Sequence, residues 1–119
     1  MTGIICLDKP KGMSSFMAVK RASRILGVKK AVHTGTLDPM ATGVLVVLVG
    51  RAAKACEYIS SDRKTYRATM RLGLTTDTED ITGEVLTKSE NIPDSDTVKA
   101  VCGEFVGDLK QIPPMYSAL

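Results

Sequence analysis

The chain has 119 residues, of which 44% are hydrophobic and 24% are charged. This length and balance suit one globular piece with a core of its own, and they exclude a wholly disordered chain. The longest apolar run, at residues 44–49, is too short for a membrane-spanning helix, so we expect an intracellular protein.

Cysteine and histidine content limits the chemistry of the chain. The three cysteines, Cys6, Cys56 and Cys102, lie far apart in the sequence, and each has apolar neighbours. Such a set is typical of reduced thiols in the core of a cytosolic protein. Since the chain has no CxxC pair and only 1 histidine, we expect no metal site.

The net charge of +3 is unevenly distributed along the chain. Residues 1–71 carry 13 basic and 4 acidic side chains, a net charge of +9, whereas residues 72–119 carry 3 basic and 9 acidic side chains, a net charge of −6. A basic first part suits nucleic-acid binding, because Lys and Arg contacts to phosphates supply most of the sequence-independent affinity. An ordinary solvated surface explains the charge equally well.

Residues 1–27 predict a strand followed by a helix. Residues 3–7 form a short apolar run, and a turn over residues 8–12 ends it. We expect Ser14 or Ser15 to cap the helix and Gly27 to end it. The inward-facing positions share helical spacing: Phe16, Val19, Ala22 or Ser23, and Leu26.

Three further segments precede the acidic part of the chain. Residues 44–49 predict a strand covered on both faces, because the run is apolar throughout and rich in β-branched residues. A short helix over residues 51–59 should pack on the sheet. Residues 64–74 alternate between apolar and polar side chains, which predicts a strand with one apolar and one basic face.

The remaining elements decide the fold class. Residues 84–86 predict a short strand, and Asp94 or Ser95 is expected to cap a last helix that extends to about Phe105. Strands and helices mix without regular βαβ alternation. We therefore predict an α+β fold with a mixed or antiparallel sheet and flanking helices.

The stretch at residues 33–45, HTGTLDPMATGVL, joins a loop rich in glycine and threonine to the start of the apolar run. A buried strand can fix the backbone of such a loop while the loop exposes a side chain. Asp38 is therefore a candidate for chemistry, with His33 and a strand tyrosine as its companions. Alternatively, Asp38 and Pro39 form an ordinary turn in which the carboxylate accepts local backbone hydrogen bonds.

Other chemistries lack a motif in this sequence. No GxxxxGK[ST] or GxGxxG stretch would cradle a nucleotide cofactor, and no GxSxG elbow frames a serine nucleophile. Asp77, Glu79 and Asp80 lie in a polar stretch, where solvated or turn-forming carboxylates are more common than an acid pair. A lone carboxylate fixed by its neighbours remains, and it can act as a nucleophile or a base.

The stretch at residues 33–45 resembles the signature of the tRNA pseudouridine synthase B family. Three other stretches resemble motifs of that family in the same order: GI, DKPKG and SS within residues 3–15, KTY at residues 64–66, and QIPPMYSA at residues 111–118. The resemblance spans the whole chain, and the joint agreement of the motifs makes it specific.

This resemblance implies the pseudouridine synthase catalytic-domain fold and an isomerase that converts uridine 55 in the T-loop of tRNA to pseudouridine, without a metal or an organic cofactor. Asp38 matches the catalytic aspartate, which attacks the target nucleotide. Tyr66 matches a tyrosine that stacks on the target base, and His33 matches a histidine that helps to hold the loop RNA with its base flipped out. The other matched positions support these residues: Gly35, Thr36, Leu37, Pro39, Gly43 and Lys64.

The sequence ends at Leu119, where the family continues with the rest of the catalytic domain, including a basic partner of the aspartate, and with a carboxy-terminal RNA-binding domain. We therefore expect residues 1–119 to be the amino-terminal part of a catalytic domain, inactive in isolation. The whole protein is expected to be a cytoplasmic monomer that binds the T-arm of tRNA. Two alternatives are a noncatalytic RNA-binding or RNA-folding module, and an rRNA pseudouridine synthase of the guide-RNA-dependent branch.

Overall fold

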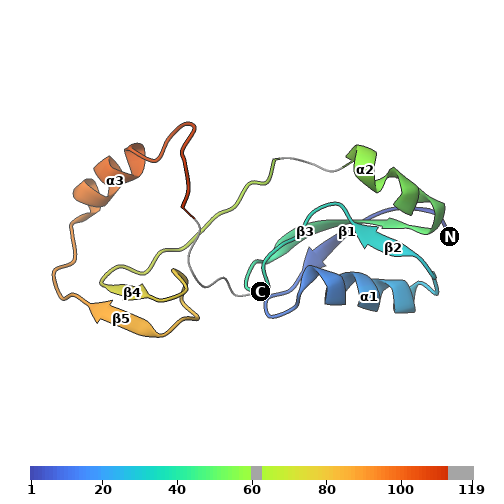
Figure 1. The fold of residues 1–119 in the computed structure, drawn as a ribbon, viewed down its shortest axis with the longest axis horizontal. Coiled ribbons are helices and arrows are strands. Elements are labelled where there is room, and N and C mark those ends of the chain that lie inside the picture. The colour runs from blue at the N-terminus through green and yellow to red at the C-terminus, as the bar shows by residue number, and fades with distance from the viewer. Residues whose placement is uncertain (60–62, 113–119) are drawn as a thin grey trace. The chain divides into compact units, whose positions relative to one another are not determined.

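The chain forms two compact units in a computed structural model that describes residues 1–59 and 63–112. The first unit is Met1–Tyr66 and the second is Arg67–Leu119. Both units contain antiparallel strands together with helices (Figure 1), so the predicted α+β fold is confirmed. From residue 113 on, the QIPPMYSA stretch lies outside the described residues.

A three-stranded antiparallel sheet forms the centre of the first unit. Its strands are β1 (Gly3–Lys9), β2 (Ala31–His33) and β3 (Gly43–Val49), in the order β1-β3-β2. The central strand β3 pairs with β1 along its whole length, with Lys9 opposite Gly43, and with β2 over three residues. The strands predicted at residues 3–7 and 44–49 are confirmed.

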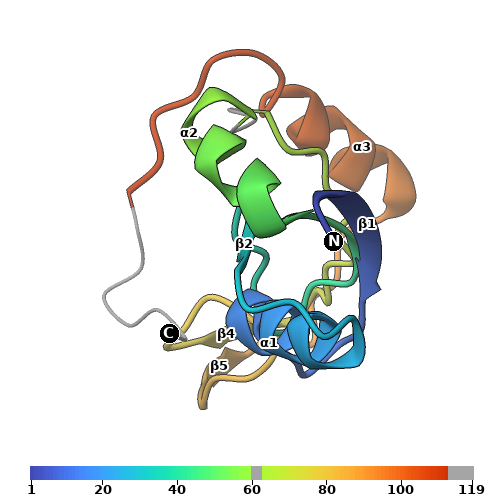
Figure 2. The same ribbon diagram turned by 90° about the vertical axis from the view of Figure 1, so that its right-hand side faces the viewer.

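Helical segments cover both faces of this sheet (Figures 1 and 2). The helix α1 (Ser15–Ile25) lies on one face, and the 3-10 helix η1 (Gly50–Ala55), which continues into α2 (Cys56–Ile59), lies on the other. The helix predicted over residues 51–59 is thus present, but its first part is wound more tightly. Within the described residues, no helix is long and apolar enough to cross a membrane.

The inner face of α1 differs from the prediction. Its buried residues are Ser15, Ala18, Val19 and Ala22, and two of them join the core formed by Leu45, Val47 and Val49. The predicted inward position of Phe16 is wrong, because that side chain is 68% exposed. The serine hydroxyl at position 15 bonds to the loop backbone of Leu37, and this contact turns Ser15 inward in place of its neighbour Phe16.

The burial of β3 changes along its length. Val47 and Leu48 are both fully buried, and since successive side chains of a strand point to opposite faces, both faces of the sheet are covered there. Val44, at the end of β3 remote from η1, is 69% exposed. The prediction of a strand covered on both faces is therefore confirmed for residues 47–49 and wrong for Val44.

The strand predicted over residues 64–74 is wrong. Of this segment only Leu74 belongs to a strand, β4 (Leu74–Thr76), and no described strand pairs with residues 64–72. Side-chain alternation shows that a segment suits a sheet, but the backbone also needs a neighbouring strand to receive its hydrogen bonds. Tyr66 is consequently an exposed residue that belongs to no helix or strand.

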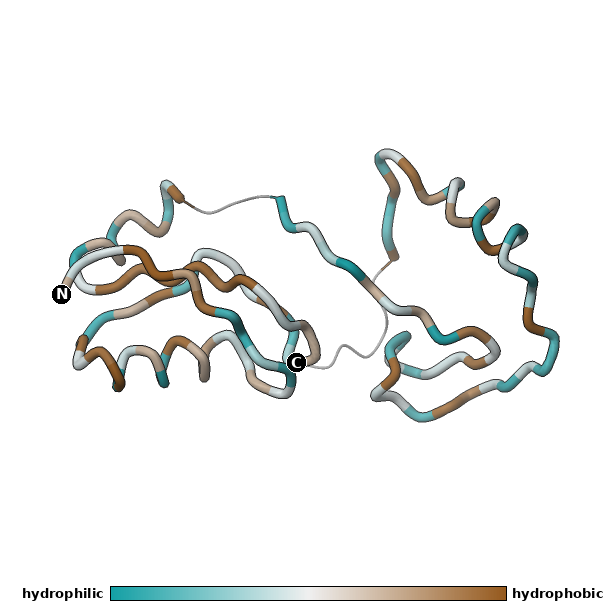
Figure 3. Tube along the Cα trace, turned by 180° about the vertical axis from the view of Figure 1, so that it is seen from behind, coloured by the Kyte–Doolittle hydropathy of each residue, from teal (hydrophilic) through white to brown (hydrophobic). Residues whose placement is uncertain are grey.

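The second unit has a two-stranded sheet and one helix. The strand β4 pairs with β5 (Val85–Lys88), and α3 (Ser95–Gly103) follows. Figure 3 shows hydrophobic residues concentrated along the strands of the first unit, whereas those of the second unit are interspersed with polar ones. In the described part of this unit no apolar side chain is buried, and Val101 on the predicted inner face of α3 is 47% exposed.

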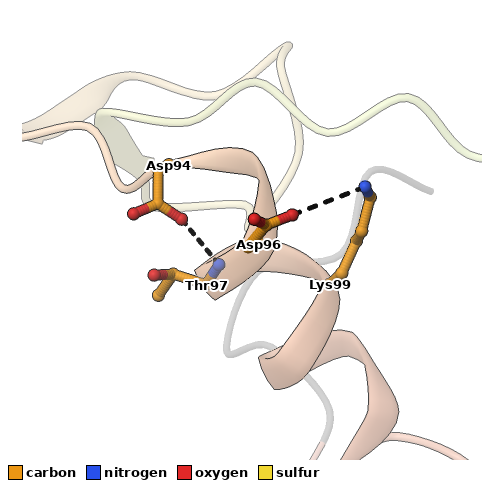
Figure 4. A network of polar contacts seen from close by, with 4 residues as sticks. All are labelled: Asp94, Asp96, Thr97 and Lys99. Carbon is orange, nitrogen blue, oxygen red and sulfur yellow. Dashed lines mark hydrogen bonds and ion pairs between the residues drawn. The ribbon is translucent and has the colours of Figure 1, made fainter.

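The start of α3 agrees with the sequence. The amide of Thr97 donates a hydrogen bond of 2.7 Å to Oδ1 of Asp94, which caps the helix as predicted (Figure 4). This backbone hydrogen bond lowers the pKa of Asp94 below its usual value. Nζ of Lys99 lies 3.7 Å from Oδ1 of Asp96 one turn along the same helix.

The cysteines do not lie in the core, contrary to prediction. All three are free, and Cys6 and Cys102 are exposed whereas Cys56 is partly buried. Alternation along β1 directs Ile5 and Leu7 toward the core, so the side chain of Cys6 points to the other face.

Candidate functional site

Asp38 lies in the loop that joins β2 to β3. The sheet fixes both ends of this loop, since Thr34 donates a backbone hydrogen bond of 3.0 Å to Val46 and Gly43 begins β3. Gly43 has φ 116°, a conformation that other residues rarely adopt. The side chain of Asp38 is exposed, and within the described residues its carboxylate makes no hydrogen bond or ion pair.

The residue before Asp38 is held by α1. Oγ of Ser15 donates a hydrogen bond of 3.0 Å to the carbonyl of Leu37 and accepts one of 2.9 Å from its amide. Ser15 is only 2% exposed. The loop backbone therefore carries the same paired hydrogen bonds that a neighbouring strand would supply.

The residue after Asp38 is held by β1 and the turn that follows it. The carbonyl of Pro39 accepts hydrogen bonds from the amide of Gly12 at 2.7 Å and from Nζ of Lys9 at 3.3 Å. Nζ of Lys9 also donates to the carbonyls of Pro10 and Met13, at 3.0 and 2.7 Å. Lys9 is completely buried, and its three donors match three carbonyl acceptors.

A pocket of about 400 Å³ lies beside this loop. Its wall includes Gly35, Val44, Val46, Lys64 and Tyr66. A Cβ atom at Gly35 would lie 2.9 Å from Cε of Lys64, so glycine allows the lysine side chain to pass close to the loop. The structure thus brings Lys64 and Tyr66 to the predicted loop, although Asp38 is not among the described residues of the wall.

His33 lies in a different place from Tyr66. Its imidazole lines a pocket of about 520 Å³ between α1 and β2, together with Phe16, Lys20 and Lys29. Nδ1 is buried and has no hydrogen-bond partner within the described residues, while the backbone carbonyl accepts a bond from Sγ of Cys56 at 3.4 Å. His33 is not among the described residues that line the pocket beside the Asp38 loop.

A basic surface adjoins the His33 pocket. A further pocket of about 420 Å³ is bordered by four cationic side chains, Lys29, Lys30, Arg51 and Lys54, and no described acidic residue lines it. Lys29 borders both pockets. These residues come from the loop before β2 and from η1, so the fold gathers on one surface cations that are separated in sequence.

The acidic stretch of the second unit forms a turn. Oδ1 of Asp80 accepts hydrogen bonds from the amide of Thr82 at 2.7 Å and from the hydroxyls of Thr82 and Thr78, at 2.5 and 2.9 Å. The Thr82 hydroxyl contributes most to lowering the pKa of Asp80. Asp77 likewise accepts a bond from the amide of Glu84. These carboxylates are turn-forming, as the sequence indicates, and no described cluster could hold a metal ion.

The remaining predicted site residues occupy the same loop. Thr36 is exposed, and Leu37 is partly buried against the core of the first unit. The sequence did not reveal the roles of Lys9 and Ser15, which looked like a turn residue and a helix cap. Their sequence signal is their place in the DKPKG and SS stretches, which resemble motifs of the family.

Comparison with known protein families shows the family to which the chain belongs. The family model described as "TruB family pseudouridylate synthase (N terminal domain)" matches residues 23–119. The chain belongs to the TruB family. The match includes the loop of Asp38 and the segment of Tyr66.

Curated TruB relatives align with the whole chain. The tRNA pseudouridine synthase B of Syntrophotalea carbinolica is 47% identical over 120 residues, and those of Geotalea uraniireducens and Burkholderia pseudomallei are each 49% identical, over 120 and 119 residues. Each alignment covers 100% of this chain and 39% of the relative. The chain therefore spans about two fifths of the length of these relatives.

Solved structures share the fold. A chain in the crystal structure of a Cbf5-Nop10-Gar1 complex matches 98% of this chain with a TM-score of 0.63 and 29% sequence identity. A chain in the structure of an H/ACA RNP bound to a substrate RNA containing 2'-deoxyuridine matches 93% of it, with a TM-score of 0.61 and 29% identity. In each case 30% of the solved chain is covered. The pseudouridine synthase fold implied by the sequence is confirmed.

Proposed function

We propose that this chain carries the catalytic aspartate of a tRNA pseudouridine synthase, which isomerises uridine 55 in the T-loop of tRNA. The observation that carries the proposal is the loop of Asp38, fixed on both sides and exposing one carboxylate. Identity of 47–49% to tRNA pseudouridine synthase B, against 29% to the chain of the Cbf5 complex, favours tRNA over guide-RNA-directed rRNA. These relatives do not favour a noncatalytic module.

Asp38 acts as the nucleophile in this proposal. In the isomerisation the C1′–N1 bond of uridine breaks and a C1′–C5 bond forms, while C5 loses a proton and N1 gains one. The reaction is redox-neutral and atom-balanced, so it requires no cofactor. A covalent bond between Asp38 and the nucleotide retains the target while its base turns.

Tyr66 and His33 receive the RNA. The pocket beside the loop exposes the ring of Tyr66, on which a flipped uracil stacks, recovering about 1–3 kcal/mol of the stacking lost from the RNA. His33, which lines the pocket between α1 and β2, is proposed to help hold the T-loop, as its place in the motif implies. The cations at Lys29, Lys30, Arg51 and Lys54 suit the phosphates of the T-arm.

The whole protein is proposed to act as a monomer in the cytoplasm. The three free cysteines suit a reducing compartment. Residues 1–119 alone should show little or no turnover, because the described residues offer the carboxylate of Asp38 no basic partner and an isolated nucleophile is poorly preorganised. Turnover of the isolated chain at the rate of the full-length protein would contradict this part of the proposal.

The Asp38→Asn variant of the full-length protein tests the proposal. Pseudouridine formation in a T-arm RNA should fall by about 10³-fold or more, as expected for loss of a nucleophile, while RNA binding stays within a fewfold. The matched control is Asp96→Asn, since Asp96 is exposed on α3 and, among the described residues, forms an ion pair with Lys99 alone. Undiminished product formation by Asp38→Asn would exclude Asp38 as the nucleophile.

A further inference from the structure

We propose that Ser15 is a positioning residue that directs the carboxylate of Asp38, an inference that rests on the proposed function. Ser15 is the first residue of α1 and lies 22 residues before Leu37, whose two backbone groups its hydroxyl holds. Its role is to fix the backbone plane from which the Asp38 side chain projects.

The geometry of the peptide planes carries the argument. The carbonyl of Leu37 and the amide of Asp38 belong to one planar peptide group. Because Oγ of Ser15 donates to that carbonyl at 3.0 Å, it fixes the plane on the amino-terminal side of Asp38. On the carboxy-terminal side, the carbonyl of Asp38 accepts a hydrogen bond of 3.0 Å from the amide of Ala41.

These two planes decide the direction in which the Cα–Cβ bond of Asp38 leaves the backbone. The described residues offer the Asp38 side chain no hydrogen bond of its own, so the backbone at Cα sets the range of positions that its rotamers can reach. Pro39 also restricts the backbone of Asp38, the residue before it, and the carbonyl of Pro39 is held by Lys9 and Gly12. Loss of the Ser15 hydroxyl would release the one plane that no other described group fixes.

Two neighbouring serines have separate roles. Oγ of Ser14 accepts a hydrogen bond of 3.2 Å from the amide of Met17 and caps α1. Ser15 makes no capping contact, and its hydroxyl reaches the loop instead. Ser15 is only 2% exposed. A serine that merely started the helix would not need to be buried in this way. Ser14→Ala is therefore a matched control that weakens the same helix without touching Leu37.

The test measures single-turnover rates of the full-length protein at saturating T-arm RNA, together with RNA affinity and thermal unfolding. Ser15→Ala should lower the rate by about 10- to 100-fold, since a displacement of about 1 Å costs about that much, while RNA affinity changes less than about threefold. Ser15→Cys keeps a similar volume with a weaker hydrogen-bonding group and should show a smaller loss in the same direction. Ser15→Thr keeps the hydroxyl and should restore most of the rate. Ser14→Ala should lower the unfolding temperature but leave the rate unchanged.

The outcomes separate this inference from the proposed function. If Asp38→Asn is inactive while folded Ser15→Ala or Ser15→Cys reacts at the unsubstituted rate, Ser15 is structural and the inference is wrong. An equal loss of rate in Ser14→Ala would also overturn it, because the effect would then come from α1 as a whole. If Asp38→Asn retains full activity, the proposed function itself fails. Should Ser15→Ala not fold, Ser15→Cys decides alone.

Discussion

The two units differ in how their residues are buried. In the described residues, every buried apolar side chain belongs to the first unit, whereas the second unit buries only Thr76. The first unit surrounds a three-stranded sheet with helices on both faces, and the second has a two-stranded sheet, which is marginally stable by itself. The loop of Asp38 is anchored in the unit that has a core, as a group requiring fixed geometry needs to be.

Charge follows the same division. The cations that border the pockets near His33 belong to the first unit, while the second unit holds the acidic turn of Asp77 and Asp80. A polyanion is attracted to the first unit and repelled by that turn. The first unit therefore holds both the buried core and the basic pockets of the described residues.

A matched pair of leucine truncations tests the comparison most strongly. Leu48 is fully buried whereas Leu86, on β5, is 64% exposed. Leu48→Ala should lower the free energy of unfolding by about 2–5 kcal/mol, because it leaves a cavity in the core. Leu86→Ala should change it by less than about 0.5 kcal/mol. Chemical denaturation measures the free energy of unfolding of both variants. Equal losses would show that the second unit contributes a core as stabilising as that of the first unit.

A second pair compares Lys9, the last residue of β1, with Lys11 in the turn that follows. Lys9 is fully buried and donates to three carbonyls, whereas Lys11 is exposed. Lys9→Met should cost about 1–3 kcal/mol of unfolding free energy, because buried carbonyls lose a charged donor. Lys11→Met should be nearly neutral. Thermal and denaturant unfolding measure the stability of both variants. If Lys9→Met is as stable as Lys11→Met, the hydrogen bonds of Lys9 to the three carbonyls do not stabilise the fold.

RNA binding should separate the units by charge. Lys30 borders the basic pocket of the first unit, and Lys88 is an exposed residue of β5 in the second. Lys30→Gln should weaken binding of T-arm RNA severalfold and reduce the slope of log affinity against log salt by about 1. Lys88→Gln should change neither. Titrations at several salt concentrations measure the slopes, and equal slopes would contradict a phosphate contact at Lys30.

The smallest effect is expected at the cap of α3. Hydrogen bonds from Thr97 lower the pKa of Asp94 in the folded state. The carboxylate of Asp94 therefore stabilises the helix fully when the pH is above the pKa of the unfolded state. This stabilisation is lost as the pH falls through the lower pKa of the folded state. Helicity of α3 should decrease on acidification in the parent protein and depend less on pH in Asp94→Ala. Amide hydrogen exchange of α3 residues at several pH values measures how stable the helix is in each protein. Asp108→Ala, at an exposed site after the helix, is the control.

Local patterns predicted most of the regular elements. The apolar runs at residues 3–7 and 44–49 became β1 and β3, and the capping residues Ser14 and Asp94 begin α1 and α3. These features depend on interactions within a few residues, namely side-chain periodicity and caps. The sequence likewise indicated the loop of Asp38 and its family motif.

Interactions between distant residues could not be predicted in this way. Residues 64–74 have the alternation of a strand, but a strand forms only where a neighbour pairs with it, and the described residues supply none before Leu74. The orientation of Phe16 was missed for a related reason, since the contact of Ser15 with Leu37 decides which face of α1 is buried. The placement of His33 and Tyr66 in separate pockets also depends on tertiary packing.

The sequence by itself determined the family, the fold class and the residue proposed to react. Only the tertiary structure decided how that residue is held, because Lys9 and Ser15 reach the loop across 30 and 22 positions of the chain. Periodicity reports which side chains prefer burial, whereas hydrogen bonds between distant backbone groups depend on how the chain closes. The sequence therefore predicts a turn at Asp38, and the fold shows that distant residues hold the backbone of this turn in place.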